Sequence, residues 1–155
     1  MAKKLKLKYF SAGEIFKKHS KKKESKAVLE VWNNFGKDKK FHKNKIDKVQ
    51  IRKARKGNIV ICSKLSIFML KYLATYKIWI HAPLKIRAAR TAKRDKIQFK
   101  EALREIRKRQ KIERTSWKKM YGFDYFDQRK LADMVIDSSK LTVNQTVNKI
   151  LKCMR

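Results

Sequence analysis

The sequence predicts one α/β domain, residues 1–155, in which a parallel sheet is covered by helices. Three short apolar runs, at 58–62, 78–80 and 134–136, have the composition of strands buried on both faces. Segments with helical spacing separate them, an alternation typical of a parallel sheet. With 155 residues, 43% of them hydrophobic, and only one Pro and four Gly, the chain is long enough to bury one core.

The first third of the chain is mostly helical in pattern. Residues 2–8 resemble the end of an amphipathic helix, 9–10 a very short strand and 11–13 a turn before a helix at 15–16. Apolar residues at helical spacing predict a helix over 27–32 and another over 46–56, for which Gly57 is a suitable C-cap.

The strand at 78–80 is followed by a basic helix. Pro83 suits a first helical position, where no N–H donor is needed. Arg87, Arg90 and Arg94 then lie on one helical face. Open α/β sheets bind phosphate ligands at the carboxyl ends of their strands, so we expect these arginines to face such a ligand. The alternative is a basic helix that faces only solvent.

The second half of the chain predicts a projecting helical hairpin over residues 97–121. An apolar helical stripe (Phe99, Leu103, Ile106) gives way to a nearly all-polar stretch at 107–115, as in a helix that has left the core. After the strand at 134–136, Thr142 and Gln145 form a capping-box pattern. We expect four residues of the final helix to face inward: Val143, Val147, Ile150 and Leu151.

The composition is strongly basic. Lys plus Arg is 44 and Asp plus Glu is 13, a net charge of +31, which a polyanion would stabilise. Nucleic acid is the commonest such partner and a membrane surface the second. No apolar run approaches the roughly 20 residues of a membrane span, and neither Cys62 and Cys153 nor the three histidines have metal-ligand spacing. We expect a cytoplasmic protein with reduced thiols and no bound metal.

Five stretches follow one another in an order that resembles archaeal-type cytidylate kinases. They are YFSAGEIF (9–16), IDKVQ (46–50), KIWIHAPLKIRAARTAKRD (77–95), KKMYGFD (118–124) and MVIDSSKLT (134–142). The resemblance covers nearly all of the chain and implies a nucleoside monophosphate kinase fold. It also implies that the segment around Ser11 and Gly13 helps to hold a nucleotide, and that 97–121 is a lid bringing arginines onto the transferred phosphates.

The sequence departs from that family in its phosphate-binding equipment. It contains no glycine-rich loop with a Gly-Lys-Ser/Thr ending, the main apparatus of phosphoryl transfer. After the strand at 58–62 the family's Glu-Gly-Arg is replaced by Cys62-Ser63-Lys64. Lys17 and Ser116 stand where the family has Arg, whereas Arg109 and Arg114 are retained.

The resemblance also implies that the first strand of the sheet is missing. In this fold it lies centrally, between the strands at 58–62 and 78–80. Either these strands close up against each other, or a partner supplies the strand, or the coding region starts further upstream, since the sequence begins inside a predicted helix.

The first functional hypothesis is a non-catalytic RNA-binding protein of a ribonucleoprotein such as the ribosome, bound to rRNA and neighbouring subunits. It rests on the charge and on the missing loop. The expected phosphate and RNA contacts are basic residues: Arg87, Arg90, Arg94, Arg104, Arg107, Lys108, Arg109, Lys111 and Arg114. Trp117, Tyr121, Tyr125 and Phe126 either stack on unpaired bases or pack in the core, which we favour for Trp117 and Tyr121.

The alternative hypothesis is a cytidylate kinase that transfers the γ-phosphoryl of ATP, with Mg²⁺, to CMP or dCMP. It requires a phosphate loop from upstream or from a separate polypeptide. By resemblance, the nucleotide would be held by Ser11, Gly13, Lys17, Asp47, Gln50 and Lys64. Arg109 and Arg114 would then stabilise phosphoryl charge.

Overall fold

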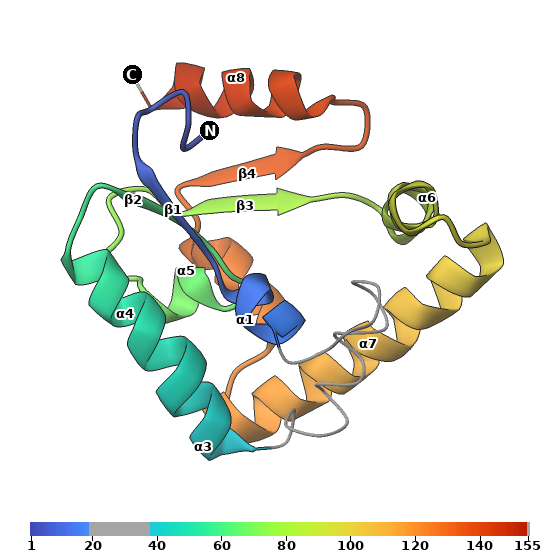
Figure 1. Ribbon diagram of the computed structural model, residues 1–155, viewed down its shortest axis with the longest axis horizontal. Helices are drawn as coiled ribbons and strands as arrows, with labels where there is room; N and C mark the ends of the chain where they lie inside the picture. The colour runs from blue at the N-terminus through green and yellow to red at the C-terminus, as the bar shows by residue number, and fades with distance from the viewer. Residues whose placement is uncertain (19–37, 155) are drawn as a thin grey trace.

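The computed structural model describes residues 1–18 and 38–154, and the helix predicted at 27–32 lies outside these ranges. Four short strands form two separate parallel pairs (Figure 1). β1 (Lys8–Ser11) pairs with β2 (Ile59–Cys62), and β3 (Ile78–His81) pairs with β4 (Met134–Asp137). The predicted α/β class and its parallel strands are thus confirmed.

β2 and β3 do not pair with each other in the described part of the chain. The sheet is divided into the orders β1-β2 and β3-β4. Pairing of β2 with β3 was one expected way to accommodate a missing central strand. The described residues do not adopt it. β2 and β3 each keep one edge without a strand partner within the described ranges.

A bent helical arm follows the first strand. α1 (Ala12–Lys18) follows directly on β1. Further along the chain, three helical segments are continuous with one another: α3 (Lys39–Phe41), the wider π-helical turn η1 (His42–Asp47) and α4 (Lys48–Arg55) (Figure 1). α4 ends at Arg55 with Lys56 as its C-cap, one residue before the predicted Gly57. Gly57 follows the cap, and its φ of 68° is a left-handed conformation that glycine adopts without strain.

The predicted hairpin at 97–121 is a single helix, so that prediction is wrong. α6 (Leu84–Asp95) stops at Lys96, which has left-handed backbone angles, and α7 (Phe99–Tyr121) continues for 23 residues and packs against α6. Its polar middle does not project fully into solvent, because Glu113 is buried there with ionic partners. A polar stripe can therefore face the interior when its charges are paired.

The last elements carry the chain back to its beginning. η2 (Tyr125–Leu131) leads to β4, and α8 (Val143–Cys153) lies along the β3–β4 pair (Figure 1). α8 begins with the predicted capping box, although Val143 is 81% exposed and does not face inward. The predicted amphipathic helix end at 2–8 is instead a set of turns leading into β1; here Lys4 Nζ donates to Asn148 Oδ1 at 2.8 Å.

The main core cluster joins α7 to the segment after β2. Leu65, Trp117 and Met120 are buried together, and α5 (Ser66–Met69) adds Met69 beside them. Phe68 of α5 also stacks on Phe123, which lies between α7 and η2, with ring centroids 3.9 Å apart. This packing fixes α7 across the carboxyl end of β2. None of the helices in the described ranges combines the length and apolar character needed to cross a bilayer.

Candidate functional site

A small cavity lies where β1 and β2 end, against the middle of α7. Its volume is about 80 Å³, less than the roughly 300 Å³ at which ligand pockets usually begin. The lining comes from four parts of the chain: Ala12, Gly13, His42, Ile46, Asp47, Ser63, Lys64, Leu65, Arg109, Glu113 and Trp117.

Glu113 is the centre of the charge cluster in this cavity. Its side chain is only 3% exposed. It accepts a hydrogen bond from Lys64 Nζ and another from Arg109 Nε, the second at 2.8 Å. Burial by itself raises the pKa of Glu113, but Lys64 and Arg109 outweigh it and lower the pKa below the usual glutamate value. Glu113 is therefore ionised at neutral pH and ties the loop after β2 to α7.

Aromatic rings and a buried amide hold Lys64 in place. Its ammonium lies over Trp117 and Tyr125, 5.7 and 5.9 Å from the ring centroids. Gln128 is fully buried and donates from Nε2 to the Lys64 carbonyl at 3.1 Å, while its Oε1 accepts from the Phe68 N–H at 3.1 Å. The position of this cation is thus set by contacts on several sides.

The other side of the cavity contains a second buried carboxylate. Tyr121 donates its hydroxyl to Asp47 Oδ2 at 2.7 Å, and Gln50 Nε2 donates to Oδ1 at 3.4 Å. Burial raises the pKa of Asp47, although both hydrogen bonds act in the opposite direction. Burial also lowers the pKa of the nearby His42, which favours the neutral imidazole.

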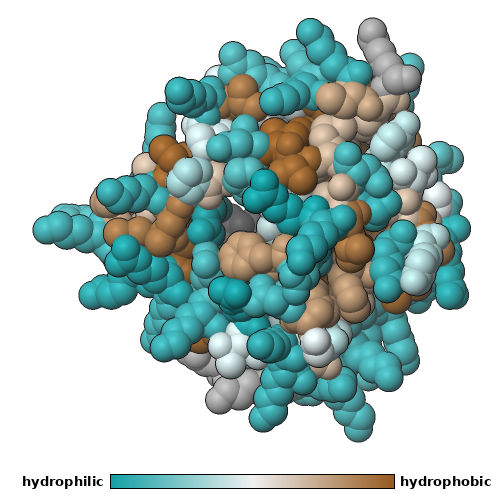
Figure 2. Space-filling model, turned by 180° about the vertical axis from the view of Figure 1, so that it is seen from behind, coloured by the Kyte–Doolittle hydropathy of each residue, from teal (hydrophilic) through white to brown (hydrophobic). Residues whose placement is uncertain are grey.

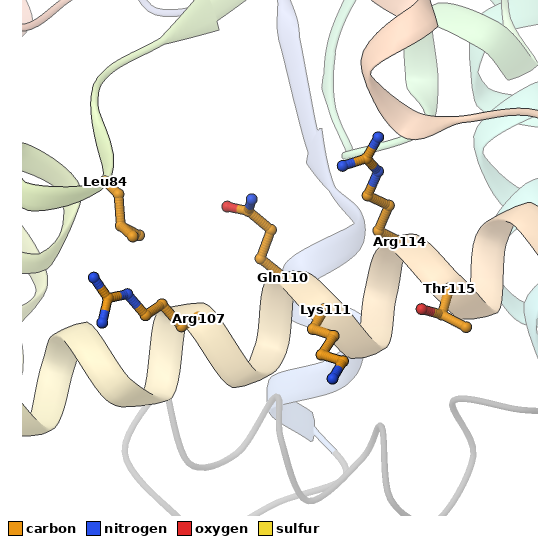
Figure 3. A pocket seen from close by; sticks show the side chains of 6 residues that line it. All are labelled: Leu84, Arg107, Gln110, Lys111, Arg114 and Thr115. Carbon is orange, nitrogen blue, oxygen red and sulfur yellow. The ribbon is translucent and has the colours of Figure 1, made fainter.

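A second, larger hollow lies on another face of α7. It measures about 280 Å³ and is bordered by Leu84 at the start of α6 and by five α7 side chains: Arg107, Gln110, Lys111, Arg114 and Thr115. Figure 3 shows Gln110 and Arg114 extending from α7 on the side of Leu84. Arg87 Nη2 donates to Gln110 Oε1 at 2.8 Å and so joins α6 to this border. The hollow has three cations and no acidic lining residue, a setting suited to an anion.

Of the nine basic residues expected to bind RNA or phosphate, some bind other groups of the protein and the rest have no such contact among the described residues. Five make contacts within the protein: Arg87, Arg90, Arg94, Arg109 and Arg114. Arg90 is the clearest case, because it donates to Ser138 Oγ at 3.1 Å and to the Ser138 carbonyl at 2.5 Å. Arg107 and Lys111 line the larger hollow, whereas Arg104 and Lys108 are exposed elsewhere on α7.

The aromatic residues considered for base stacking are mostly packed. Trp117 is 5% exposed, as the core interpretation predicts. Tyr125 contacts both Trp79 and Trp117, with centroids 5.1 and 5.2 Å away. Phe126 is 42% exposed, and the Arg114 guanidinium carbon lies 5.1 Å from its ring centroid.

Most residues expected to hold a nucleotide gather at the smaller cavity. Gly13, Asp47 and Lys64 line it. Ser11 ends β1, and a Cβ on Gly13 would lie 3.4 Å from its Oγ, so the glycine leaves room beside that hydroxyl. Gln50 reaches the site only through Asp47. Lys17 is in α1, and its side chain lies outside the described part of the structure.

Sequence reasoning missed three residues that organise the cavity, namely Glu113, Gln128 and His42. Glu113 stands in a stretch read as a solvated helix face. A signal was available, because Arg109 and Glu113 have the i,i+4 spacing of a helical ion pair. Gln128 and His42 have no comparable pattern in the sequence. The described residues contain no group of three or more His, Cys, Asp or Glu suited to holding a metal ion.

The parallel strand pairs and their covering helices are consistent with the fold of the nucleoside monophosphate kinase class. Residues 1–140 match the family model described as "Cytidylate kinase-like family". The chain belongs to the cytidylate kinase-like family.

Relatives from several archaeal species agree with this assignment. Over 155 aligned residues the chain is 35% identical to the cytidylate kinase of Methanopyrus kandleri, covering 94% of this chain and 78% of that protein. It is 35% identical to the cytidylate kinase of Pyrococcus horikoshii (86% and 68% covered) and 31% identical to that of Ignicoccus hospitalis (97% and 88% covered). These comparisons favour the kinase hypothesis, and none of them supports the ribosomal RNA-binding one.

Proposed function

We propose that this chain is the nucleoside-monophosphate-binding and lid portion of a cytidylate kinase, which works with a phosphate loop from outside this sequence. The reaction is transfer of the γ-phosphoryl group of ATP to a phosphate oxygen of CMP or dCMP. The γ-phosphorus bond to the ADP oxygen breaks and a bond to the CMP oxygen forms, giving ADP and CDP.

The observation that carries the proposal is the meeting of Gly13, Asp47 and Lys64 with Arg109 at one cavity. These residues come from the ends of β1 and β2, from η1 and from α7. A site at the carboxyl ends of parallel strands is where α/β folds bind phosphorylated ligands. The names of the relatives, all cytidylate kinases, supply the substrate class.

The cations at this cavity keep donors available while they are paired. Lys64 has three N–H donors and gives one to Glu113. Arg109 donates to Glu113 from Nε, so in the described contacts its two terminal nitrogens are left for an anion. Glu113 thus orients both cations without using all of their donors. Their task is to hold and neutralise phosphate oxygens in the transition state.

The larger hollow supplies further positive charge on the same helix. Arg107 and Lys111 border it, and Arg114 points from α7 with its Nε bound to Asp124 at 2.6 Å. In this proposal, these cations neutralise phosphates of the second nucleotide. ATP would enter as its Mg²⁺ complex, and the ion would supply further neutralisation of phosphate charge.

The cavity must widen before a nucleotide can enter, because its volume is only about 80 Å³. The Lys64–Glu113 and Arg109–Glu113 contacts hold α7 against the loop after β2. Movement of α7 relative to this loop would open the cavity, and its return would exclude water.

Isothermal titration of the chain with CMP, UMP, AMP and GMP tests the proposal. We expect CMP to bind most tightly, and Lys64→Ala or Arg109→Ala to weaken CMP binding at least tenfold, since each removes a charge-assisted phosphate contact. Lys100→Ala is the matched control, because Lys100 is an exposed residue of the same helix α7. Equal affinity for the four nucleotides, or equal losses in all three variants, would contradict the proposal.

A further inference from the structure

Every exposed side chain of α4 is basic. Together with the preceding turn η1 and the C-cap of the helix, α4 presents five exposed cations: Lys45, Lys48, Arg52, Arg55 and Lys56. Their spacing of three or four residues places them on one side of the helical arm. The only acidic residue among positions 39–58 is Asp47, which is buried and accepts the Tyr121 hydroxyl. We call the five cations the α4 basic face.

The α4 basic face has no role in holding the protein together. Its side chains take part in no hydrogen bond, ion pair or ring contact within the described part of the chain. The arginines of α6 and α7 differ in this respect, because Arg87, Arg90 and Arg109 all donate to other groups of the protein. The structure thus leaves α4, rather than the arginines of α6, available to an external anion.

The cations of this face also repel one another. Four pairs of them are three or four residues apart, a spacing at which like charges destabilise a helix. The helix dipole favours Arg55 and Lys56, which stand at the carboxyl end of α4. It does not favour Lys45 and Lys48, since the first turn of α4 is where anions are preferred and it contains no acidic residue. A polyanion bound along this side would relieve the repulsion.

The face carries charge without hydrophobic surface. None of the exposed large hydrophobic side chains of the described residues lies between positions 38 and 58. Single-stranded nucleic acids are bound by stacking their bases on exposed aromatic rings, and membrane-bound helices insert an apolar face between lipids. The α4 basic face offers neither of these features. A double helix is the polyanion that suits it, because its bases are stacked internally and its phosphates face outward.

The dimensions and position of α4 suit a duplex as well. From Lys48 to Lys56 the helix rises about 12 Å, at 1.5 Å per residue. A duplex carries about seven phosphates over that length, at one charge per 1.7 Å of its axis, which is enough for each of the cations there. α4 lies at the outer edge of the molecule (Figure 1), and hydrophilic side chains project around most of the outline seen from behind (Figure 2).

We propose that the α4 basic face binds the phosphate backbone of double-stranded nucleic acid without reading its base sequence. The proposal does not depend on the kinase function. Asp47 and Gln50 of the same arm are buried, at 7% and 0% exposure, and lie toward the smaller cavity. The basic residues lie on the solvent side. One helical arm can therefore serve two ligands on two of its sides.

Fluorescence anisotropy of the full chain with labelled RNA and DNA duplexes tests the proposal. Binding of each duplex is measured from about 50 to 200 mM salt. One variant removes four charges of the face: Lys48→Gln, Arg52→Gln, Arg55→Gln and Lys56→Gln. The matched control removes four exposed charges of α6, α8 and the segment before α8: Lys85→Gln, Lys140→Gln, Lys149→Gln and Lys152→Gln.

We expect the α4 variant to bind duplex at least tenfold more weakly than wild type, with a salt slope smaller by about three to four, since each phosphate contact contributes about one. The control variant should change the affinity less than about threefold. A third variant that exchanges the same four residues between Lys and Arg keeps the charge and should bind as wild type. The melting temperature of each variant without ligand should not fall, because the substituted side chains are exposed.

Four results would overturn the proposal. They are equal losses in the α4 and control variants, binding that does not depend on salt, tighter binding of a single strand than of its duplex, and binding of phosphatidylserine vesicles without binding of either duplex. Isothermal titration with CMP separates this proposal from the kinase function. Loss of duplex binding with unchanged CMP affinity would support the α4 basic face whether or not CMP proves to be a substrate. CMP-selective binding by a chain that binds no duplex would refute the face and leave the kinase function standing.

Discussion

The carboxylate of Glu113, in the middle of α7, accepts a hydrogen bond from the ammonium of Lys64, which follows β2 and is 49 residues away in sequence. Arg109, one helical turn before Glu113, donates to the same carboxylate at 2.8 Å. This three-residue contact joins the long helix to the end of the strand pair. It explains why a mostly polar helical stretch lies against the body of the protein.

Glu113→Gln should destabilise the protein by about 1–3 kcal/mol, because two cations lose their buried counter-charge. The loss of stability should stay below that of a fully buried, unpaired charge, since the side chains of Lys64 and Arg109 are 41% and 29% exposed. Urea unfolding at pH 7 measures the change. Asp127→Asn removes an exposed ion pair with Lys130 and should cost less than about 0.5 kcal/mol. Equal effects of the two substitutions would show that Glu113 is not a structural centre.

The contribution of Glu113 should depend on pH in one direction. Its pKa is lowered in the folded protein, so the stabilisation is complete above the unfolded value of about 4.3 and is lost as the pH falls through the lower folded value. The difference in unfolding free energy between wild type and Glu113→Gln should therefore be constant from pH 5 to pH 7 and shrink below about pH 4. Urea titrations across this range measure it. A difference that grew on acidification would contradict the assigned ion pair.

Arg90 should prove to be a structural residue. It fixes the segment after β4 by donating to the carbonyls of Ser138 and Ser139 and to the Ser138 hydroxyl. Arg90→Lys keeps the charge but loses the planar fork, so we expect a loss of about 1–2 kcal/mol on thermal unfolding. Arg104→Lys, at an exposed position of α7, is the control and should be neutral. If Arg90→Lys left the stability unchanged, the Arg90 contacts would not be structurally important and its side chain would be available to bind an external anion.

Removing the Tyr121 hydroxyl and removing the Asp47 charge should change the stability of the protein in different ways. Tyr121→Phe takes away a donor from a buried carboxylate and should cost about 1–3 kcal/mol at pH 7. Asp47→Asn keeps an acceptor for the hydroxyl and removes the buried charge. Since the pKa of Asp47 is raised, its favourable contribution is present at low pH and is lost as the pH rises through the folded value. Asp47→Asn should therefore cost less at pH 7 than at pH 3, and chemical unfolding at the two values tests this. A cost that rose with pH would mean that the ionised carboxylate stabilises the fold.

Local patterns in the sequence were sufficient for the strands and for several helix ends. The runs around Val60, Trp79 and Val135 are apolar without interruption, a composition that predicts strands. The expected burial on both faces is not found, since Ile80 is 51% and Val135 39% exposed. The end of α4 just before Gly57 and the start of α8 after Thr142 depend on backbone conformation and capping, which involve only neighbouring residues. The gathering of Gly13, Asp47 and Lys64 at one cavity agrees with the expectation from the family resemblance.

The α/β class, the strand positions and the large positive charge could be predicted before folding was known, because they depend on residue composition and short-range spacing. Which charges are paired inside the protein became clear only from the packed fold. Whether Glu113 is a solvated side chain or a buried anchor depends on Lys64, 49 residues away. The division of the sheet between β2 and β3 was likewise decided in three dimensions, since strand pairing is a contact between distant segments that no local pattern encodes.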